Sequence, residues 1–353
     1  MTLIEARLRE ALAVSLNGLP LRQAITAVER LKGAYRGTTP THTPVLRDRS
    51  DVVAYAAYRM PATFEAARAA LGAFADRVPG WAPARHVDLG GGTGAATWAV
   101  ADVWGGGTAS TVLDWAEPAL ELGRELAADA LPGTDWRRDR ITGSLQLPEA
   151  DLVTLSYVLG ELTGADRAAA VAAAARAADA VAVVEPGTPE GYLRVLAARD
   201  ALVADGFRVV APCPHSGTCP LVPGEDWCHF AARVARSSLH RQVKGGALSH
   251  EDEKFSYVAA VRTPAPEAES EAGKASGPAS GQEEPAAARI VRRPQIRKGQ
   301  VLLDLCEPDG VVRRAVVSKR HGPRYRAARD ADWGDEWMAG PPDEPSGGPP
   351  GER

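Results

Sequence analysis

The sequence predicts an α/β fold built on a doubly wound, Rossmann-like parallel sheet, and three observations support this. From Trp81 onward, short apolar segments alternate with alanine-rich helical segments, the pattern of β-α-β units. The first apolar segment, His86 to Leu89, runs directly into Gly90-Gly91-Gly92-Thr93-Gly94 and then into a helix that begins near Ala95. A second strand, Ser110 to Leu113, ends in Asp114. A strand, a glycine turn, a helix start and a following acid form a nucleoside-binding unit.

Residues 1–80 are predicted to form a helical region in front of this sheet. An apolar residue recurs at every fourth position of the first helix, and Thr2 with Glu5 can cap it. A second helix is expected over Leu21 to Tyr35 and a third over Asp51 to Phe74, with Pro61 interrupting the third. The members of the apolar stripe are Ile4, Leu8, Leu12 and Leu16.

Residues 81–263 contain the strands of the predicted sheet domain. After the first two strands, a third is expected around Trp136, a fourth over Asp151 to Ser156, and a fifth over Ala180 to Val184. The last two strands are expected over Phe207 to Ala211 and Phe255 to Val261. A cysteine-rich insertion, residues 212–250, separates these last two strands.

The glycine turn is the candidate cofactor loop. Gly90-x-Gly92-x-x-Ala95 fits the dinucleotide fingerprint as well, so the glycines alone do not separate a nicotinamide site from an S-adenosylmethionine site. Asp88 and Gly94 complete an acidic-x-G-x-G-x-G string, which resembles motif one of the class I methyltransferases. By that resemblance Asp114 is the acid that binds the ribose and Asp139 contacts the adenine. The cofactor set is therefore Asp88, Gly90, Gly92, Gly94, Asp114 and Asp139.

No catalytic residue can be assigned. Amino-methylating enzymes often carry Asn or Asp followed by Pro-Pro-aromatic after the fourth strand, but this chain reads Leu155-Ser156-Tyr157-Val158-Leu159-Gly160-Glu161. Tyr157 and Glu161 could face the methyl group, although a Glu that opens a helix commonly serves the helix dipole. Cofactor binding is thus better supported by the sequence than catalysis.

Three of the four cysteines lie within the stretch PCPHSGTCPLVPGEDWCHF, residues 212–230. Cys213, Cys219 and Cys228 stand among prolines and glycines, which form loops that let thiolates converge. With Cys306 they make four, the number of a closed structural zinc site or of one iron–sulfur cluster. His215 and His229 are alternative ligands, and buried unrelated cysteines or disulfides are the competing interpretations.

The overall composition is that of a globular protein without a membrane segment. Hydrophobic residues make up 45% and charged residues 24% of the chain, and no apolar run approaches the ~20 residues that span a bilayer. The first residues interleave Glu and Arg with apolar residues, unlike a secretory signal. We therefore expect a cytoplasmic monomer that does not associate with membranes.

The C-terminal part has a composition of its own. Residues 264–288 are rich in Pro, Glu, Ala, Ser and Gly and are expected to be a disordered linker, as are residues 339–353 at the end of the chain. Residues 289–338 form a basic unit, with twelve Lys and Arg against three acids between Arg289 and Arg329. Two apolar segments flank Pro308-Asp309-Gly310, a hairpin signal. The net charge of the whole chain is -4, so the basic unit is the part that would attract phosphate backbones.

Several motifs together resemble one family, the methyltransferase-like assembly factors of the small ribosomal subunit, which are found in mitochondria and, as relatives, in bacteria. The resemblance rests on AYAAYRMPAT, VDLGGGTGAATWA, CPHSGTCPL, DWCHF, EDEKFSYVA and ARDADWGDEW. It implies a [4Fe-4S] cluster on Cys213, Cys219, Cys228 and Cys306, with zinc as the alternative, and binding to small-subunit rRNA. The expected function is S-adenosylmethionine-dependent methylation of rRNA, or assembly without catalysis. A zinc-bearing RNA methyltransferase and a non-enzymatic ribosome-binding module are the alternatives.

Overall fold

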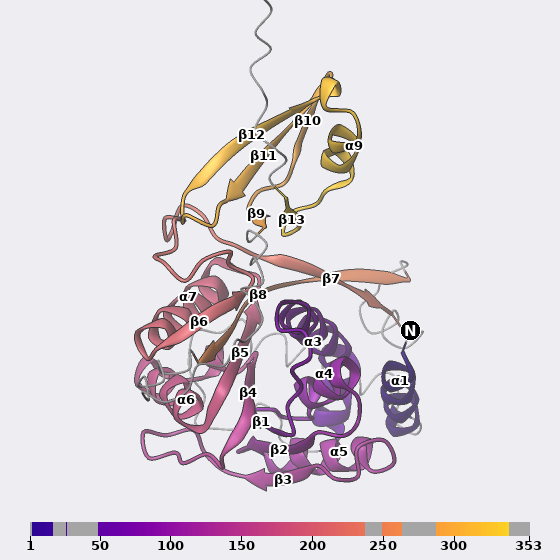
Figure 1. The fold of residues 1–353 in the computed structure, drawn as a ribbon. Coiled ribbons are helices and arrows are strands. Elements are labelled where there is room, and N and C mark those ends of the chain that lie inside the picture. The colour runs from indigo at the N-terminus through magenta and orange to yellow at the C-terminus, as the bar shows by residue number, and fades with distance from the viewer. Residues whose placement is uncertain (1, 17–25, 27–48, 237–248, 263–286, 339–353) are drawn as a thin grey trace, which may run out of the picture.

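The computed structural model describes residues 2–16, 26, 49–236, 249–262 and 287–338 (Figure 1). The predicted helix over Leu21 to Tyr35 and most of the linker and tail lie outside these ranges. The elements of the first part are α1 (Leu3–Leu16), α3 (Arg49–Arg77), β1 (Arg85–Leu89), α4 (Ala95–Trp104), β2 (Ala109–Asp114), α5 (Glu117–Ala127), β3 (Asp135–Arg138), β4 (Ala150–Ser156), η1 (Leu159–Glu161), α6 (Gly164–Ala177), β5 (Ala178–Pro186), α7 (Pro189–Ala204), β6 (Phe207–Ala211), β7 (Phe230–Ala235) and β8 (His250–Arg262).

These strands form one mixed sheet in the order β3-β2-β1-β4-β5-β8-β6, and β7 pairs with β8. Strands β1 to β5 are parallel, whereas β8 runs antiparallel to β5, β6 and β7. The α/β, Rossmann-like prediction is confirmed. β7 was not expected, although Phe230, Ala232 and Val234 alternate with exposed residues along it.

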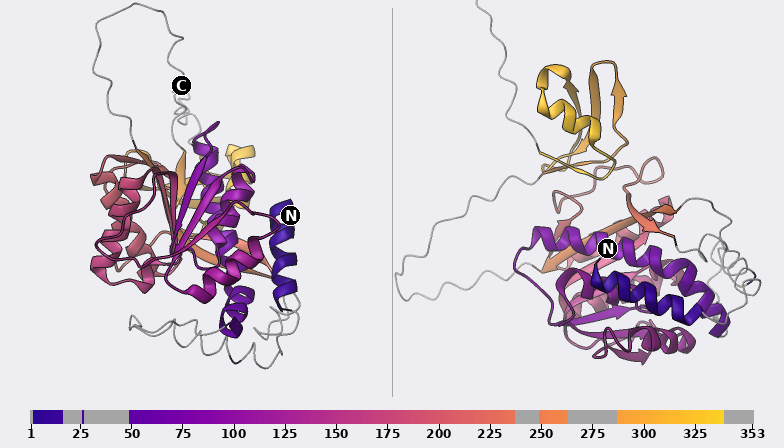
Figure 2. Two further views of the ribbon diagram at one scale, coloured as in Figure 1. Left: turned by 90° about the horizontal axis from the view of Figure 1, so that it is seen from below. Right: turned by 90° about the vertical axis from the view of Figure 1, so that its right-hand side faces the viewer.

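Each face of the sheet is buried under its own set of helices (Figure 2). The helices α1, α3, α4 and α5 share one apolar cluster with strand residues such as Leu152 and Ala182. The helices α6 and α7 share a second cluster with Val153 and Val183, the neighbours of those residues along the same strands. Burial on both faces explains why these strands are continuous apolar runs in the sequence.

Helix α3 runs without a break from Arg49 to Arg77, so the helix does not restart at Pro61 as one form of the prediction had it. A proline inside a helix removes one backbone hydrogen bond and crowds the preceding turn. Here the flanking residues Met60, Ala62 and Phe64 are at most 1% exposed and belong to the core. We attribute the survival of the helix to this burial on both sides of the proline.

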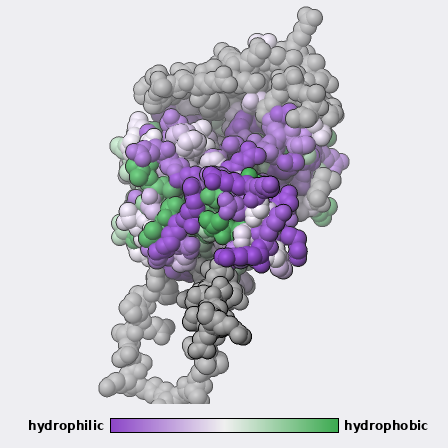
Figure 3. Space-filling model, turned by 90° about the horizontal axis from the view of Figure 1, so that it is seen from above, coloured by the Kyte–Doolittle hydropathy of each residue, from purple (hydrophilic) through white to green (hydrophobic). Residues whose placement is uncertain are grey.

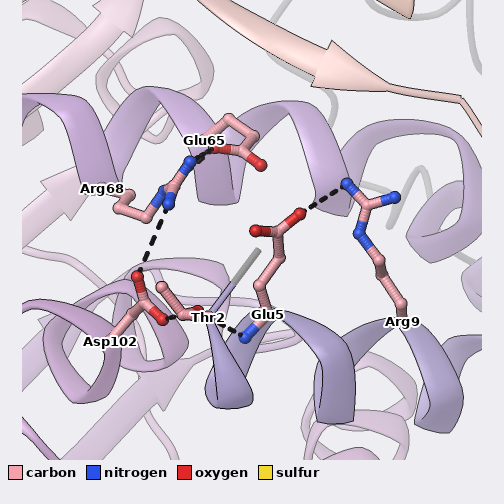
Figure 4. Close-up of polar contacts among 6 residues, drawn as sticks. All are labelled: Thr2, Glu5, Arg9, Glu65, Arg68 and Asp102. Atoms are coloured by element: carbon pink, nitrogen blue, oxygen red, sulfur yellow. Dashed lines mark hydrogen bonds and ion pairs between the residues drawn. The ribbon is translucent and has the colours of Figure 1, made fainter.

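Thr2, just before α1, is linked to α4, and α4 to α3, by a chain of polar contacts (Figure 4). The Glu5 N–H donates to Thr2 Oγ1 at 3.1 Å, while the Glu5 carboxylate pairs with Arg9 at 2.7 Å instead of completing a capping box. Arg68 of α3 donates from Nε to Glu65 at 3.0 Å and lies 3.7 Å from Asp102 of α4. Thr2 Oγ1 also donates to Asp102, which closes the network.

A separate small unit follows, with a five-stranded sheet of order β10-β11-β9-β13 in which β12 pairs with β11. Its elements are β9 (Ala288–Ile290), β10 (Gln295–Arg297), β11 (Gln300–Cys306), β12 (Val312–Ser318), η2 (Lys319–His321), α9 (Pro323–Asp330) and β13 (Glu336–Trp337). The expected hairpin is β11-β12, and Ala288, assigned in advance to the linker, already belongs to β9. Its core consists of Ile290, Val301, Leu303, Leu305 and Trp337, together with a few smaller neighbours.

Within the part of the chain that the structure describes, no helix has both the length and the apolar character needed to span a bilayer.

Candidate functional site

The glycine loop joins β1 to α4 at the carboxyl edge of the sheet. Gly90, Gly92 and Gly94 have φ of 71°, 55° and 84°, values that side-chain-bearing residues rarely adopt. The Gly90 N–H donates to the Leu113 carbonyl at 2.7 Å, which holds the loop against the end of β2. A Cβ on Gly90 would lie 2.2 Å from Val158 Cγ2, whereas one on Gly92 would meet only Asp114 at 3.8 Å. Gly90 is thus required by packing, and Gly92 by its backbone conformation beside open space.

Asp114 lies where the sequence predicts the ribose-binding acid. One carboxylate oxygen accepts the Gly92 N–H at 2.9 Å and the other accepts the Ala116 N–H at 2.9 Å. Burial raises the pKa of Asp114, while these backbone hydrogen bonds oppose the rise. Asp139 is exposed after β3, and its N–H donates to the Asp114 carbonyl at 3.0 Å. The structure therefore places Gly92, Asp114 and Asp139 along one edge.

Asp88 differs from these residues because its side chain is fully buried, with 0% exposure. One carboxylate oxygen accepts both the N–H and the hydroxyl of Thr97, at 3.2 and 3.0 Å. The other accepts the Thr154 hydroxyl at 2.9 Å. Asp88 thus ties the first turn of α4 to β1 and β4 from beneath the loop.

The polar chain continues through His86, which is 1% exposed. His86 Nε2 lies 2.9 Å from Thr154 Oγ1, and Nδ1 lies 3.1 Å from Ser110 Oγ. Because Thr154 donates its hydrogen to Asp88, the network assigns the proton of His86 to Nε2. Burial lowers the pKa of His86 to about 3 and raises the pKa of Asp88 to about 6. Sequence reasoning missed His86, Thr97 and Thr154, and a histidine inside an apolar strand was the available signal.

Two residues considered as neighbours of the methyl group follow β4. Tyr157 is half-buried directly after the strand, and Glu161 is exposed at the end of η1. The structure therefore brings Tyr157, but not the side chain of Glu161, toward the interior.

The four cysteines come together from two distant segments. All four are free thiols. The C-terminal unit that carries Cys306 contacts the insertion through Arg289 and Arg292 and lies beside it in Figure 1. Burial, helped by nearby Cys213 and Cys219, raises the pKa of Cys306 to about 12. Burial also raises the pKa of Cys228 well above its usual value, with Cys213, Cys219 and Cys306 contributing. Each thiol is therefore within electrostatic reach of the others.

The two histidines considered as ligands have different surroundings. His215 Nε2 lies 3.5 Å from Cys306 Sγ. The His229 ring packs against Trp227 and Trp333, with ring centroids 5.7 and 3.8 Å away. Of the two, His215 is thus the one that touches a thiol.

Further polar contacts link the cysteine-bearing insertion to α7 and to the C-terminal unit. The Tyr192 hydroxyl of α7 lies 3.3 Å from Cys219 Sγ, and Arg289 Nε of β9 donates to the Pro212 carbonyl at 3.1 Å. Arg292 pairs with Asp226 of the insertion. Nowhere in the described ranges do three or more His, Cys, Asp or Glu side chains stand close enough to hold one metal ion. The structure therefore does not show the predicted metal site on the four cysteines.

Comparisons with known proteins converge on one family. A family model described as mitochondrial small ribosomal subunit Rsm22 matches residues 49–338. The human ribosome assembly protein METTL17, mitochondrial, is 29% identical over 304 residues, which cover 80% of this chain and 61% of that protein. The ribosome assembly protein RSM22, mitochondrial, of Saccharomyces cerevisiae is 25% identical over 181 residues, covering 38% of this chain and 29% of that protein. The chain thus spans less than two thirds of these relatives.

Among solved structures, a magnesium protoporphyrin IX methyltransferase from Synechocystis PCC 6803 aligns with a TM-score of 0.39 and 13% identity, covering 67% of this chain and 94% of that one.

The prediction of a cytoplasmic protein is contradicted by these names. The family model and both curated relatives are described as mitochondrial. Glu and Arg residues among the first apolar residues distinguish this segment from a secretory signal, but they do not bear on import into mitochondria.

Proposed function

This chain belongs to the family described as mitochondrial small ribosomal subunit Rsm22, and on that premise we propose that it is an S-adenosylmethionine-binding factor for assembly of the small ribosomal subunit. The family resemblance read from the sequence is thereby confirmed. The names of the human and yeast relatives support the role in ribosome assembly.

The observation that carries cofactor binding is the pairing of the glycine loop with Asp114. Backbone N–H groups in left-handed glycine turns at a helix start form a cradle for a ligand, and the space beside Gly92 is open. The Gly92 and Ala116 N–H groups donate to different oxygens of Asp114, and a carboxylate has about four acceptor sites, so capacity for a ribose hydroxyl remains. Asp139 is exposed at the same edge for the adenine. We assign Asp88 to supporting the loop, since it is fully buried.

When bound, S-adenosylmethionine supplies an already activated methyl group, so the protein mainly has to align the acceptor. The segment after β4 lacks the sequence that amino-methylating enzymes use. Our proposal is therefore cofactor binding on the ribosomal subunit, with rRNA methylation as the activity that the same site would support.

We also propose that Cys213, Cys219, Cys228 and Cys306 hold an iron–sulfur cluster. The support is the donor set: four buried or half-buried thiols converge, and Arg199 and Arg289 lie near enough to lower the pKa of Cys213 against the effect of burial. A [4Fe-4S] cluster places an iron–sulfur cube between its thiolates, so its ligands stand further apart than those of one zinc ion. Bound there, the cluster would link the insertion to the C-terminal unit.

The rRNA contact is proposed for one end of the C-terminal unit. The Lys319 N–H donates to the Gly299 carbonyl at 3.0 Å, which brings η2 beside the turn between β10 and β11. Exposed Arg297, Lys298, Lys319 and Arg320 gather there. Figure 3 looks onto the molecule from above and shows hydrophilic residues interleaved with smaller hydrophobic patches. Clustered exposed cations of this kind bind phosphate backbones.

Calorimetric titration of the full chain with S-adenosylmethionine tests the cofactor proposal. Gly92→Val should abolish binding because a β-branched side chain at a φ of 55° distorts the loop. The matched control is Gly106→Val, at an exposed glycine with nothing within 4 Å of an added Cβ. Wild-type affinity in Gly92→Val, or no binding by the unaltered protein, would refute the proposal.

A further inference from the structure

The residue directly after β4 stands at the point where the order of the sheet reverses. The strands run outward from β1 to β2 and β3 on one side and to β4 and β5 on the other. In open α/β sheets, ligands bind outside the carboxyl ends of the strands at this switch point. The glycine loop forms one side of that crevice, and the segment from Tyr157 to Leu159 forms the other. The two sides are in contact, since Val158 occupies the space that a side chain on Gly90 would need.

Tyr157 has a φ of 58°, and among the residues that the structure describes it is the single non-glycine with a positive φ. Such a conformation is costly for a bulky side chain, and it persists only where the surroundings enforce it. A glycine would adopt it without strain. Retaining an aromatic side chain at this backbone position therefore points to a use for the ring.

Three elements enforce the conformation. The Tyr157 N–H donates to the Val184 carbonyl of β5 at 2.8 Å, and its hydroxyl donates to Glu253 of β8 at 3.0 Å. Arg59 of α3 donates to both oxygens of Glu253, at 3.0 and 3.3 Å, and its guanidinium lies 5.3 Å from the centre of the Tyr157 ring. Residues that are far apart in the sequence thus fix one half-buried ring at the crevice.

The chemistry of this cluster favours orientation over proton transfer. Burial and the adjacent Glu253 raise the pKa of Tyr157 well above its usual value, so the phenol keeps its proton. Both oxygens of Glu253 already accept hydrogen bonds, and Arg59 stays charged. Tyr157 is half-buried and the Arg59 side chain is 25% exposed, so neither is sealed inside the core. Aromatic rings and guanidinium planes are the surfaces against which unstacked nucleobases lie in RNA-binding proteins.

We propose that Tyr157, held by Glu253 and Arg59, is the positioning residue on the acceptor side of the cofactor crevice, and that a planar nucleobase of single-stranded RNA lies against it. This rests on the proposed function, in which RNA is the partner. It differs from the cationic end of the C-terminal unit, because Tyr157 would contact a base and no phosphate.

The test measures binding of a fluorescein-labelled single-stranded RNA dodecamer of mixed sequence to the full chain saturated with S-adenosylhomocysteine. Tyr157→Asn removes the ring but keeps a residue that tolerates a positive φ, so RNA affinity should fall about 5- to 150-fold, the effect of losing one stacked base. Tyr157→Phe keeps the ring and should change affinity less than about 3-fold, because stacking on a π-face does not require the hydroxyl. The slope of affinity against salt should not change in either variant, since no phosphate contact is lost.

Calorimetry with S-adenosylhomocysteine is the control for folding, and both variants should retain the affinity of the unaltered protein. If Tyr157→Asn also loses cofactor binding, the RNA affinity of Glu253→Gln replaces it as the test, because this variant loosens the ring without removing it and should also weaken RNA binding. The inference about Tyr157 is overturned, and the proposed function is not, if the variant used for the test binds RNA as tightly as the unaltered protein does. An unaltered protein that does not bind the dodecamer refutes the proposed RNA partner and the nucleobase with it.

Discussion

The buried Asp88 carboxylate should lower the stability of the fold while serving the cofactor loop. Its pKa is about 6 in the fold against 3.8 in a free side chain, because burial disfavours the charge. At pH 7 this difference costs about 3 kcal/mol, at ~1.4 kcal/mol for each pKa unit. The groups nearest to it are Asp114, whose charge raises the pKa further, and Thr97 and Thr154, whose hydrogen bonds lower it.

The sign follows from proton linkage. Since the folded pKa is raised, the folded state binds more protons than the unfolded state between about pH 4 and pH 6. The contribution of Asp88 to stability is therefore fully present below about pH 4 and is lost as the pH rises through about 6. From pH 5 to pH 7 the loss should be about 1 kcal/mol.

Asp88→Asn tests this reasoning, because it removes the charge and keeps the shape. In urea unfolding followed by tryptophan fluorescence, the difference in unfolding free energy between variant and unaltered protein should grow by about 1 kcal/mol from pH 5 to pH 7. The variant should bind S-adenosylmethionine at least about tenfold more weakly, since the Thr97 N–H loses its charged acceptor. Asp139→Asn, which removes an exposed carboxylate instead of a buried one, is the control variant, and its free energy of unfolding is measured at the same pH values. A difference that stays constant with pH, or an unimpaired cofactor affinity, would refute the account.

Three further predictions concern the contacts between distant segments. Replacing Arg297, Lys298, Lys319 and Arg320 by Ala should lower the slope of log RNA affinity against log salt concentration by about 3, at ~0.7 to 0.9 per phosphate contact. The control is the double variant Arg313→Ala with Arg314→Ala, whose partners are Asp309 and Asp304 and which should leave the slope unchanged. Equal slopes in the two variants would contradict the proposed position of the RNA contact. Cys306→Ser should remove iron and sulfide from anaerobically purified protein without changing S-adenosylmethionine affinity by calorimetry, whereas a full metal content would exclude Cys306 as a ligand. Arg68→Met should lower the free energy of unfolding in urea by about 1 to 3 kcal/mol, because Glu65 and Asp102 lose their cation. The control is Arg49→Met, which breaks the exposed pair of Arg49 with Glu125 and should lower the free energy of unfolding by less than about 1 kcal/mol. Equal losses of stability in the two variants would contradict this prediction.

The central strands could be predicted from the sequence because each is buried on both faces. β4 and β5 are largely apolar runs in the middle of the sheet, and each begins and ends within about two residues of the expectation. β9, β10 and β13 were missed because they have only two or three residues and no period to detect. Their existence depends on pairing with β11 and with one another, which local sequence does not encode.

The site was predictable only where its residues are adjacent in the sequence. The glycine loop and Asp114 follow consecutive strands, whose carboxyl ends must meet at one edge. The supporting chain from Ser110 through His86 and Thr154 to Asp88 joins three strands side by side, so it depends on strand order. Tyr157 and Glu253 are likewise joined only because β8 enters the sheet beside β5 and carries Glu253 back to the crevice.

The basic C-terminal unit shows why charge counted from sequence overstates a phosphate-binding surface. Arg289 is buried and donates to the carbonyls of Pro212 and Gly334 and to Glu336. Arg292 pairs with Asp226, and Arg314 with both oxygens of Asp304. These arginines attach the unit to the insertion or brace its own strands, so they would have to break existing ion pairs before contacting RNA. The cations that remain exposed at one end are brought together by the hydrogen bond from Lys319 to Gly299, which no count of residues could have indicated.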